Sequence, residues 1–186
     1  MLKPVVDKLL LLFFAAGTLV MIYVMAMSGK PLKSSATPHG IIDLEFANTK
    51  TKVEKVAHAW RYNTDSPNPY ASAINNIYLD FIFLLFYAPF LYLCCVQLTR
   101  DTTKKECRKA GKIVGMSALL AGLFDVLENL GMLQSLSGNI SGNIALFTSG
   151  VSIIKWILVC IALVFIIGTI IFNISKKYTN VYKKIP

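Results

Sequence analysis

Histidine is almost absent from this sequence, and the positions of its two copies argue against one large class of membrane protein. His39 and His58 lie between the first and second long apolar runs, and no apolar run contains a histidine. A haem held by histidines inside the bilayer is therefore not expected. The spacing of the two histidines also matches no common metal-ligand pattern, so neither a metal nor another cofactor is predicted. A metal ion shared by these histidines and nearby acids stays open as an alternative.

Motifs that would identify a known chemistry are missing as well. The sequence has no glycine-rich phosphate loop, no GxSxG, no HExxH and no nucleic-acid-binding module, so nucleic acid is not a predicted partner. The YD and GxGD pair of intramembrane aspartyl proteases is absent, because the corresponding segments read YLD and GLFD. The adjacent Cys94 and Cys95 do not form a CxxC motif, so neither a disulfide framework nor thiol–disulfide exchange is expected.

Long apolar runs dominate what is present. Hydrophobic residues make up 55% of the chain and charged residues only 16%. Four runs approach or exceed the roughly 18–20 apolar residues that cross a bilayer, at about 9–27, 74–98, 113–133 and 150–173. We therefore predict an all-α integral membrane protein, a four-transmembrane-helix bundle that forms a single domain over residues 1–186. The lipid bilayer is its first predicted partner.

The first apolar run has the position of a signal peptide, but its composition favours a retained helix. Its apolar core of 19 residues exceeds the usual h-region of about 7–15 residues. Asp7 is also atypical of the basic segment that precedes such a region. We expect this run to remain in the protein as its first span.

The distribution of basic residues predicts the topology and accounts for the net charge of +9. Lys and Arg gather in the loop 99–112 and in the tail 174–186, whereas the segment 134–143 has no charged residue. By the positive-inside rule, both termini and the 99–112 loop are expected in the cytoplasm, with loops 28–73 and 134–149 outside. A bacterial cytoplasmic membrane is the predicted location.

The long outward loop contains one segment with helical periodicity. Apolar residues recur at helical spacing between Asn48 and Tyr62, and Thr49 or Thr51 is suited to cap the helix. We expect this amphipathic helix to lie along the outer membrane surface, with Trp60 and Tyr62 as interfacial anchors. A mostly irregular loop is the alternative.

Four ionisable residues fall inside the predicted spans, where a charged side chain costs about 2.5–3.5 kcal/mol at a helix centre on insertion scales. They are Asp80, Asp125, Glu128 and Lys155. At about 1.5 Å of rise per residue, each lies roughly 7–12 Å from the outward end of its helix. Four independent placements would not share one depth, so we expect these residues to form a common site in the outer third of the bilayer.

Helical spacing turns these residues toward one another. In the third span, small and polar residues recur at every third or fourth position, which places them on one helix face. Small residues allow close helix packing in a membrane, so this face is expected to point inward. The three matching faces comprise Gly111, Gly115, Ala118, Gly122, Asp125 and Asn129; Asn76, Asp80, Phe83, Tyr87 and Cys94; and Thr148, Ser152, Lys155, Val159 and Ala162. Together they predict a polar pocket that opens outward.

The outward loop supplies candidates for a lid over this pocket. Asp43 and Glu45 alternate in the segment IIDLEFA, and alternate residues of an extended strand share one face. Trp60 is a third lid candidate. The complete set of predicted ligand-binding residues is Asp80, Asp125, Glu128, Asn129, Lys155, Asn76, Tyr87, Asp43, Glu45 and Trp60.

Three functions are compatible with such a pocket. Three acids face one base within the spans, so at least one acid needs a proton or a cation, which favours binding or translocation of a small cation, proton or polar ligand. A membrane enzyme acting on a lipid or isoprenoid is the second hypothesis, with Asp125 and Glu128 as catalytic acid and base. A non-catalytic subunit of a membrane complex is the third, in which the ion pairs only fix packing. Transport by so few helices would require a homo-oligomer or a partner protein.

Overall fold

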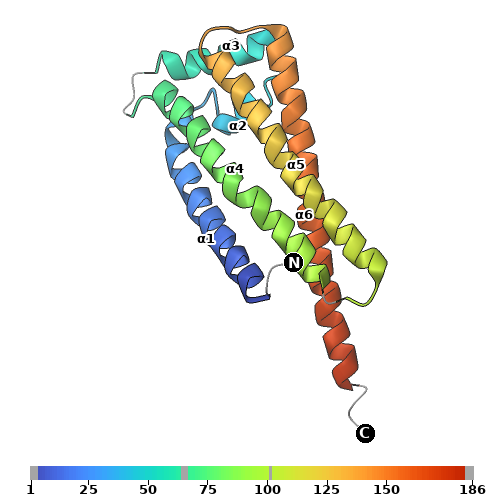
Figure 1. Cartoon of the computed structure of the whole chain (residues 1–186). Coiled ribbons are helices and arrows are strands. Elements are labelled where there is room, and N and C mark those ends of the chain that lie inside the picture. Colours follow the sequence, from blue (N-terminus) through green and yellow to red (C-terminus); the bar gives the residue numbers. More distant parts are fainter. Residues whose placement is uncertain (1–3, 64–66, 101, 183–186) are drawn as a thin grey trace.

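Four long helices account for most of the protein in the computed structural model, which describes residues 4–63, 67–100 and 102–182 (Figure 1). They are α1 (Pro4–Ser28), α4 (Pro69–Arg100), α5 (Lys105–Leu136) and α6 (Gly142–Tyr182). Each is long and apolar enough to cross a membrane, and the described residues contain no β-strand. The prediction of an all-helical chain with four candidate spans is confirmed.

The helices extend beyond the apolar runs, most clearly at the basic segment 99–112. Residues 105–112 form the first turns of α5 instead of a loop. Lysine, arginine, glutamate and alanine favour helix, so a charged segment next to an apolar run simply lengthens the same helix.

The inward face of α4 contains a different cysteine from the expected one. Cys95 is fully buried and Cys94 only half-buried.

Close packing through glycine joins α5 to α4. A side chain on Gly111 would meet Thr99 Oγ1 and would lie 2.7 Å from the backbone oxygen of Cys95, and one on Gly115 would lie 2.9 Å from the Tyr92 ring. The small-residue face of α5 therefore packs directly on α4. The pair α4–α5 forms the centre of the bundle, with α6 packed on α5 and α1 packed on α4.

Replacing Gly111 by alanine tests this packing. The added methyl group has no space against the backbone of α4, so we expect a loss of about 1–3 kcal/mol in the free energy of unfolding. Gly168→Ala is the matched control, because no atom lies within 4 Å of a side chain placed there, and helix propensity alone should favour it by up to about 1 kcal/mol. Unfolding temperatures in detergent measure both, and equal stabilisation of the two variants would contradict the packing model.

Two contacts hold α1 against α4. The Arg100 Nη1 lies 2.7 Å from Asp7 Oδ2, and the Gln97 side chain donates to the Asp7 backbone oxygen. Farther along α1, the Phe86 ring covers Gly17 so closely that any side chain there would overlap it. Between α1 and α6 there is almost no contact, so these two helices flank the central pair from different sides.

Three short helices form a cap over one end of the bundle (Figure 1). They are η1 (Lys30–Leu32), α2 (Ile41–Glu45) and α3 (Lys50–Arg61), and this region of residues 30–61 is called the cap from here on. The Thr49 hydroxyl accepts a hydrogen bond from the Lys52 backbone and so caps α3, as predicted. The apolar face of α3 is buried in a core that the cap shares with the adjoining ends of α4, α5 and α6.

Trp60 belongs to this core and is not a membrane anchor. Its side chain is 1% exposed, and its indole nitrogen donates to the Leu32 backbone oxygen at 3.0 Å and to Thr37 Oγ1 at 3.3 Å. The expectation of an interfacial Trp60 is therefore wrong. Periodicity identified the apolar face of α3 correctly but could not show whether lipid or protein covers it. Tyr62, at 70% exposure, stays accessible.

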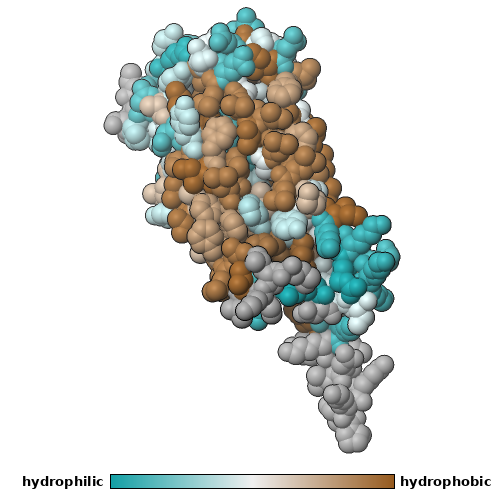
Figure 2. Space-filling view, in the orientation of Figure 1, coloured by the Kyte–Doolittle hydropathy of each residue, from teal (hydrophilic) through white to brown (hydrophobic). Residues whose placement is uncertain are grey.

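An apolar band separates the cap from the opposite, basic end of the molecule. Figure 2 shows this band across the face in view, with hydrophilic residues at the cap and at the other end. Exposed large apolar side chains occur on all four long helices, for example Phe13, Leu85, Leu123 and Val164. Such a band between two polar ends is the surface expected of a protein that crosses a bilayer.

Candidate functional site

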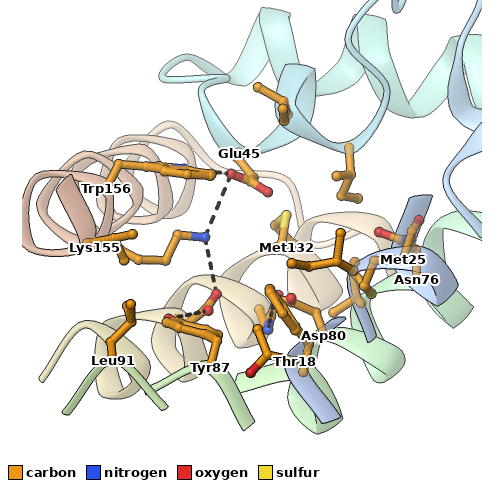
Figure 3. A pocket seen from close by; sticks show the side chains of 18 of the residues that line it. Thr18, Met25, Glu45, Asn76, Asp80, Tyr87, Leu91, Met132, Lys155 and Trp156 are labelled. Carbon is orange, nitrogen blue, oxygen red and sulfur yellow. Dashed lines mark hydrogen bonds and ion pairs between the residues drawn. The ribbon is translucent and has the colours of Figure 1, made fainter. Parts of the chain in front are cut away.

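A cavity of about 490 Å³ lies beneath the cap, between α1, α2, α4, α5 and α6 (Figure 3). Its volume falls within the range of small-molecule sites. The structure brings seven of the predicted residues to its lining, namely Glu45, Asn76, Asp80, Tyr87, Asp125, Asn129 and Lys155. The remaining lining is mostly apolar, so the polar groups are concentrated at a few positions.

Lys155 is the centre of one group of polar residues, which we call the lysine cluster (Lys155, Glu45, Asp125 and Glu128). Its ammonium lies 2.7 Å from Glu128 Oε2, 3.1 Å from Asp125 Oδ1 and 3.7 Å from Glu45 Oε2. All four side chains are 10% exposed or less. The cluster therefore joins α2, α5 and α6 through one buried cation.

Neighbouring donors complete this cluster. The Tyr87 hydroxyl donates to Asp125 Oδ2 at 2.8 Å, and the Trp156 indole donates to Glu45 Oε2 at 3.2 Å. The Ser152 hydroxyl contacts the Glu45 backbone oxygen, so successive inward residues of α6 hold the end of α2. These bonds fix the cluster in place and anchor the cap to the bundle.

A second group, which we call the acceptor wall, is formed by Asn76, Asp80 and Asn129. The Asn129 side-chain nitrogen donates to Asp80 Oδ2 at 2.8 Å, which links α5 to α4. The Asn76 side-chain nitrogen donates to the Met25 backbone oxygen at 3.2 Å and to Ser28 Oγ at 2.6 Å, which links α4 to the end of α1. A carboxylate and a backbone carbonyl only accept hydrogen bonds, so both amides must present nitrogen to these partners.

The other side of each amide has no protein partner. The Oδ1 atoms of Asn76 and Asn129 are both buried and accept no hydrogen bond from the described residues, although the residues are only 1% and 0% exposed. Buried acceptors without a partner are rare and unfavourable, by about 1–3 kcal/mol each. Both residues border the cavity, but these two oxygens have almost no accessible surface, so they are unsatisfied acceptors within its wall.

The hydrogen-bond donors of the cavity lining all have protein partners. Each nitrogen or hydroxyl that lines the cavity already donates to a protein oxygen: Thr18 to Phe14, Asn76 to Met25 and Ser28, Asn129 to Asp80, and Tyr87, Lys155 and Trp156 to the carboxylates of the lysine cluster. Within the described part of the chain, the cavity thus offers the Asp80 carboxylate without an ion pair and no donor without a partner. A ligand that fits must supply donors or positive charge.

The charge balance points the same way. Glu45, Asp80 and Asp125 line the cavity and Glu128 lies behind it, whereas Lys155 is the only basic residue in its lining. One ammonium compensates one carboxylate, and further uncompensated charges in such surroundings are strongly unfavourable. The lining therefore carries more acidic groups than its single lysine can compensate.

Three of the predicted site residues lie outside the cavity lining. Glu128 is fully buried behind the cavity lining and contacts Lys155. Trp60 is part of the cap core. Asp43 lies on the outer side of α2, where its carboxylate accepts from the His39 backbone nitrogen at 2.8 Å and contacts the His39 ring.

The separation of Asp43 from Glu45 corrects the expectation that both share one face. Residues 41–45 form the short helix α2 and are not extended. Gly40, with φ of 67°, adopts a conformation that favours glycine and turns the chain into this helix. Two residues in a helix differ by about 200° in direction, so Glu45 points inward while Asp43 points away.

The lining also contains residues that the sequence did not suggest. Thr18, Ile22 and Met25 come from α1, and Trp156 comes from α6. The α1 residues carry no charge, so the search for ionisable groups inside the spans could not find them. Trp156 is also uncharged and lies outside the predicted inward face of α6, so neither criterion selected it.

No arrangement of three or more His, Cys, Asp or Glu side chains suited to a metal ion occurs among the residues that the structure describes. Comparison of the chain with protein-family models, with curated proteins and with solved structures finds no match. The site itself is therefore the basis for a functional assignment.

Proposed function

We propose that this chain is a multi-pass protein of a bacterial cytoplasmic membrane that binds a cationic ligand in the cavity beneath the cap. The observation that carries this proposal is that every donor in the lining is engaged, while the Asp80 carboxylate lines the cavity without an ion-pair partner among the described residues. The excess of carboxylates over the single lysine supports a positive ligand. A proton, a small inorganic cation and an organic ammonium all belong to this class.

The proposed orientation places the cap outside and the basic end, with both termini, in the cytoplasm. Lys104, Lys105, Arg108, Lys109 and Lys112 lie near the turn between α4 and α5, at the opposite end from the cap. This distribution supports the orientation through the positive-inside rule. The cavity lies next to the cap, so its ligand is taken from the outer side or from the outer half of the bilayer. Transport across the membrane would need an oligomer or a partner.

Catalysis is less well supported than binding. Asp125 and Glu128, the candidate acid and base, both contact the Lys155 ammonium, and Asp125 also accepts from Tyr87. A general base must reach the proton that it removes, whereas Glu128 does not line the cavity. The lysine cluster has the features of a structural network, while the acceptor wall has those of a binding site. The two roles are thus divided between two groups of residues.

Asp80→Asn separates binding from stability. With methylammonium as the probe, the wild-type protein in detergent should unfold at a higher temperature as ligand is added, because a ligand at about 100 times its Kd stabilises by about 2.7 kcal/mol. Asp80→Asn should lose this stabilisation and still fold, since the position is half-buried and asparagine keeps an oxygen that can accept from Asn129.

Asp43→Asn is the control, because Asp43 is the same residue type near the same cavity but points away from it. It should keep the full methylammonium response. The binding proposal is wrong if wild-type protein shows no response to methylammonium, or if Asp80→Asn and Asp43→Asn respond equally.

A further inference from the structure

The cavity beneath the cap continues into an apolar groove that is open at its side. Beyond the acceptor wall, its lining consists of apolar residues such as Phe83, Phe90 and Val159. Ile22 on α1 and Leu163 on α6 both line it and are nevertheless 51% and 43% exposed. A lining residue that is also half-exposed lies at a mouth, so the groove opens between α1 and α6.

The residues at this mouth belong to the apolar helices, and Ile42 of α2, which also lines the cavity and is 41% exposed, lies at its cap end. The helices α1 and α6 flank the groove and make almost no contact with each other, so within the described residues these two helices do not close the gap between them. Leu163 follows Lys155 by eight residues, which corresponds to about 12 Å along α6. The groove therefore runs from the polar residues toward the bilayer centre over the length of a medium alkyl chain.

Polar and apolar parts of the cavity thus fit two ends of one molecule. At the polar end, Asn76 and Asn129 direct their side-chain nitrogens to other protein oxygens, and their own oxygens have almost no accessible surface. Asp80 lies beside them and supplies negative charge. We infer that the ligand is a single-chain amphipathic amine, which enters from the lipid with its ammonium on the acceptor wall and its alkyl chain in the groove. This inference rests on the proposed binding of a cation and adds the chemical class of that cation.

Anionic and uncharged head groups fit the polar end of the cavity less well than an ammonium does. An anionic head group, such as a phosphate or carboxylate, would face Asp80 and two amide oxygens and would find the lysine ammonium already held by three carboxylates. An uncharged alcohol could fill the groove but would supply one donor and no charge. An ammonium supplies three donors together with the positive charge.

The test measures quenching of Trp156 by alkylammonium ions that carry bromine near the head group. Trp156 lines the cavity, whereas Trp60, the other tryptophan of the chain, is buried in the cap core and lies outside the lining. With the protein in nanodiscs of zwitterionic lipid, bromododecylammonium should quench Trp156 in the wild type. Loss of quenching in Trp156→Phe would show that the fluorescence change comes from Trp156. Asp80→Asn should weaken bromododecylammonium binding at least tenfold. Because Trp156 is 41% exposed, bromododecanol at the same membrane concentration measures quenching from the surrounding lipid, and bromododecylammonium should quench clearly more.

Two pairs of substitutions test the groove. Ile22→Phe with Leu163→Phe narrows the mouth and should weaken bromododecylammonium binding at least tenfold. Leu12→Phe with Ile171→Phe is the control, because these residues lie on the same two helices, are 65% and 62% exposed and do not line the cavity. This pair should behave as wild type.

The possible failures can be distinguished. If methylammonium stabilises the protein through Asp80 but the narrowed groove binds the long chain normally, the amphiphile is rejected and the proposed function stands. Equal quenching by bromododecanol, or quenching that persists in Asp80→Asn, also rejects the amphiphile. If methylammonium and the long-chain amine both fail to bind, the inference and the proposed function are both wrong.

Discussion

Replacing Lys155 by methionine is expected to destabilise the protein by about 3–5 kcal/mol, the largest effect of any single change at the site. Methionine keeps the length of the side chain but removes the cation that contacts three buried carboxylates. Leaving an uncompensated buried charge is far less favourable than replacing the whole group of charges by neutral residues. We expect a lower yield of monodisperse protein in detergent and a clearly lower unfolding temperature.

Compensating substitutions distinguish lost charge from lost packing. Lys155→Met combined with Asp125→Asn and Glu128→Gln removes the cation together with two of its partners, and should recover most of the lost stability. Lys112→Met is the control, because Lys112 also lies on a helix but is exposed. Failure of the combined variant to recover stability would show that the lysine chain stabilises through packing alone.

Trp60→Ala is expected to have an effect of similar size, about 3–5 kcal/mol, through the core of the cap. It removes the largest fully buried side chain of the protein and leaves the Leu32 backbone oxygen without its indole donor. Since the cap forms one wall of the cavity through Glu45, the variant should also lose the methylammonium response. Hydrogen exchange of residues 30–61 would show whether the loss of stability begins in the cap.

Milder substitutions in and next to α3 provide a comparison for the effect of Trp60→Ala. Trp60→Phe keeps an aromatic ring but not the two hydrogen bonds, so it should cost less than Trp60→Ala. Tyr62→Ala removes an aromatic side chain of the same region that is 70% exposed, and should change stability by less than about 0.5 kcal/mol. Equal effects of Trp60→Ala and Tyr62→Ala would mean that the cap does not contribute to the folded state.

The site residues that are easiest to predict from sequence are the charged ones, because a charged side chain in a bilayer is energetically unfavourable. Asp80, Asp125 and Lys155 lie inside apolar runs, so their cost in a bilayer singles them out, and helical spacing gives the direction in which they point. The structure brings all three to the lining of one cavity. The inward faces of α5 and α6 follow from the same periodicity, with Gly111 and Ser152 as examples.

The remainder depends on tertiary contacts that periodicity does not encode. Glu45 and Asp43 are two residues apart, and which of them enters the cavity depends on the helical turn after Gly40. The contribution of α1 comes through uncharged side chains such as Ile22, whose sequence context is that of any spanning helix. Cys95 is buried where Cys94 was expected, because the position of Gly111 decides which face of α4 is covered.

The order of the chain gives the lysine cluster a consequence for biosynthesis. Glu45, Asp125 and Glu128 all precede Lys155, so the three acids leave the ribosome before the cation that they share. When α5 enters the bilayer, Asp125 and Glu128 have no ammonium to pair with until α6 brings Lys155. The hairpin of α5 and α6 therefore has to insert as a unit, and α2 can be fastened only afterwards. Assembly thus ends with α2, a segment that was synthesised before both helices of that hairpin.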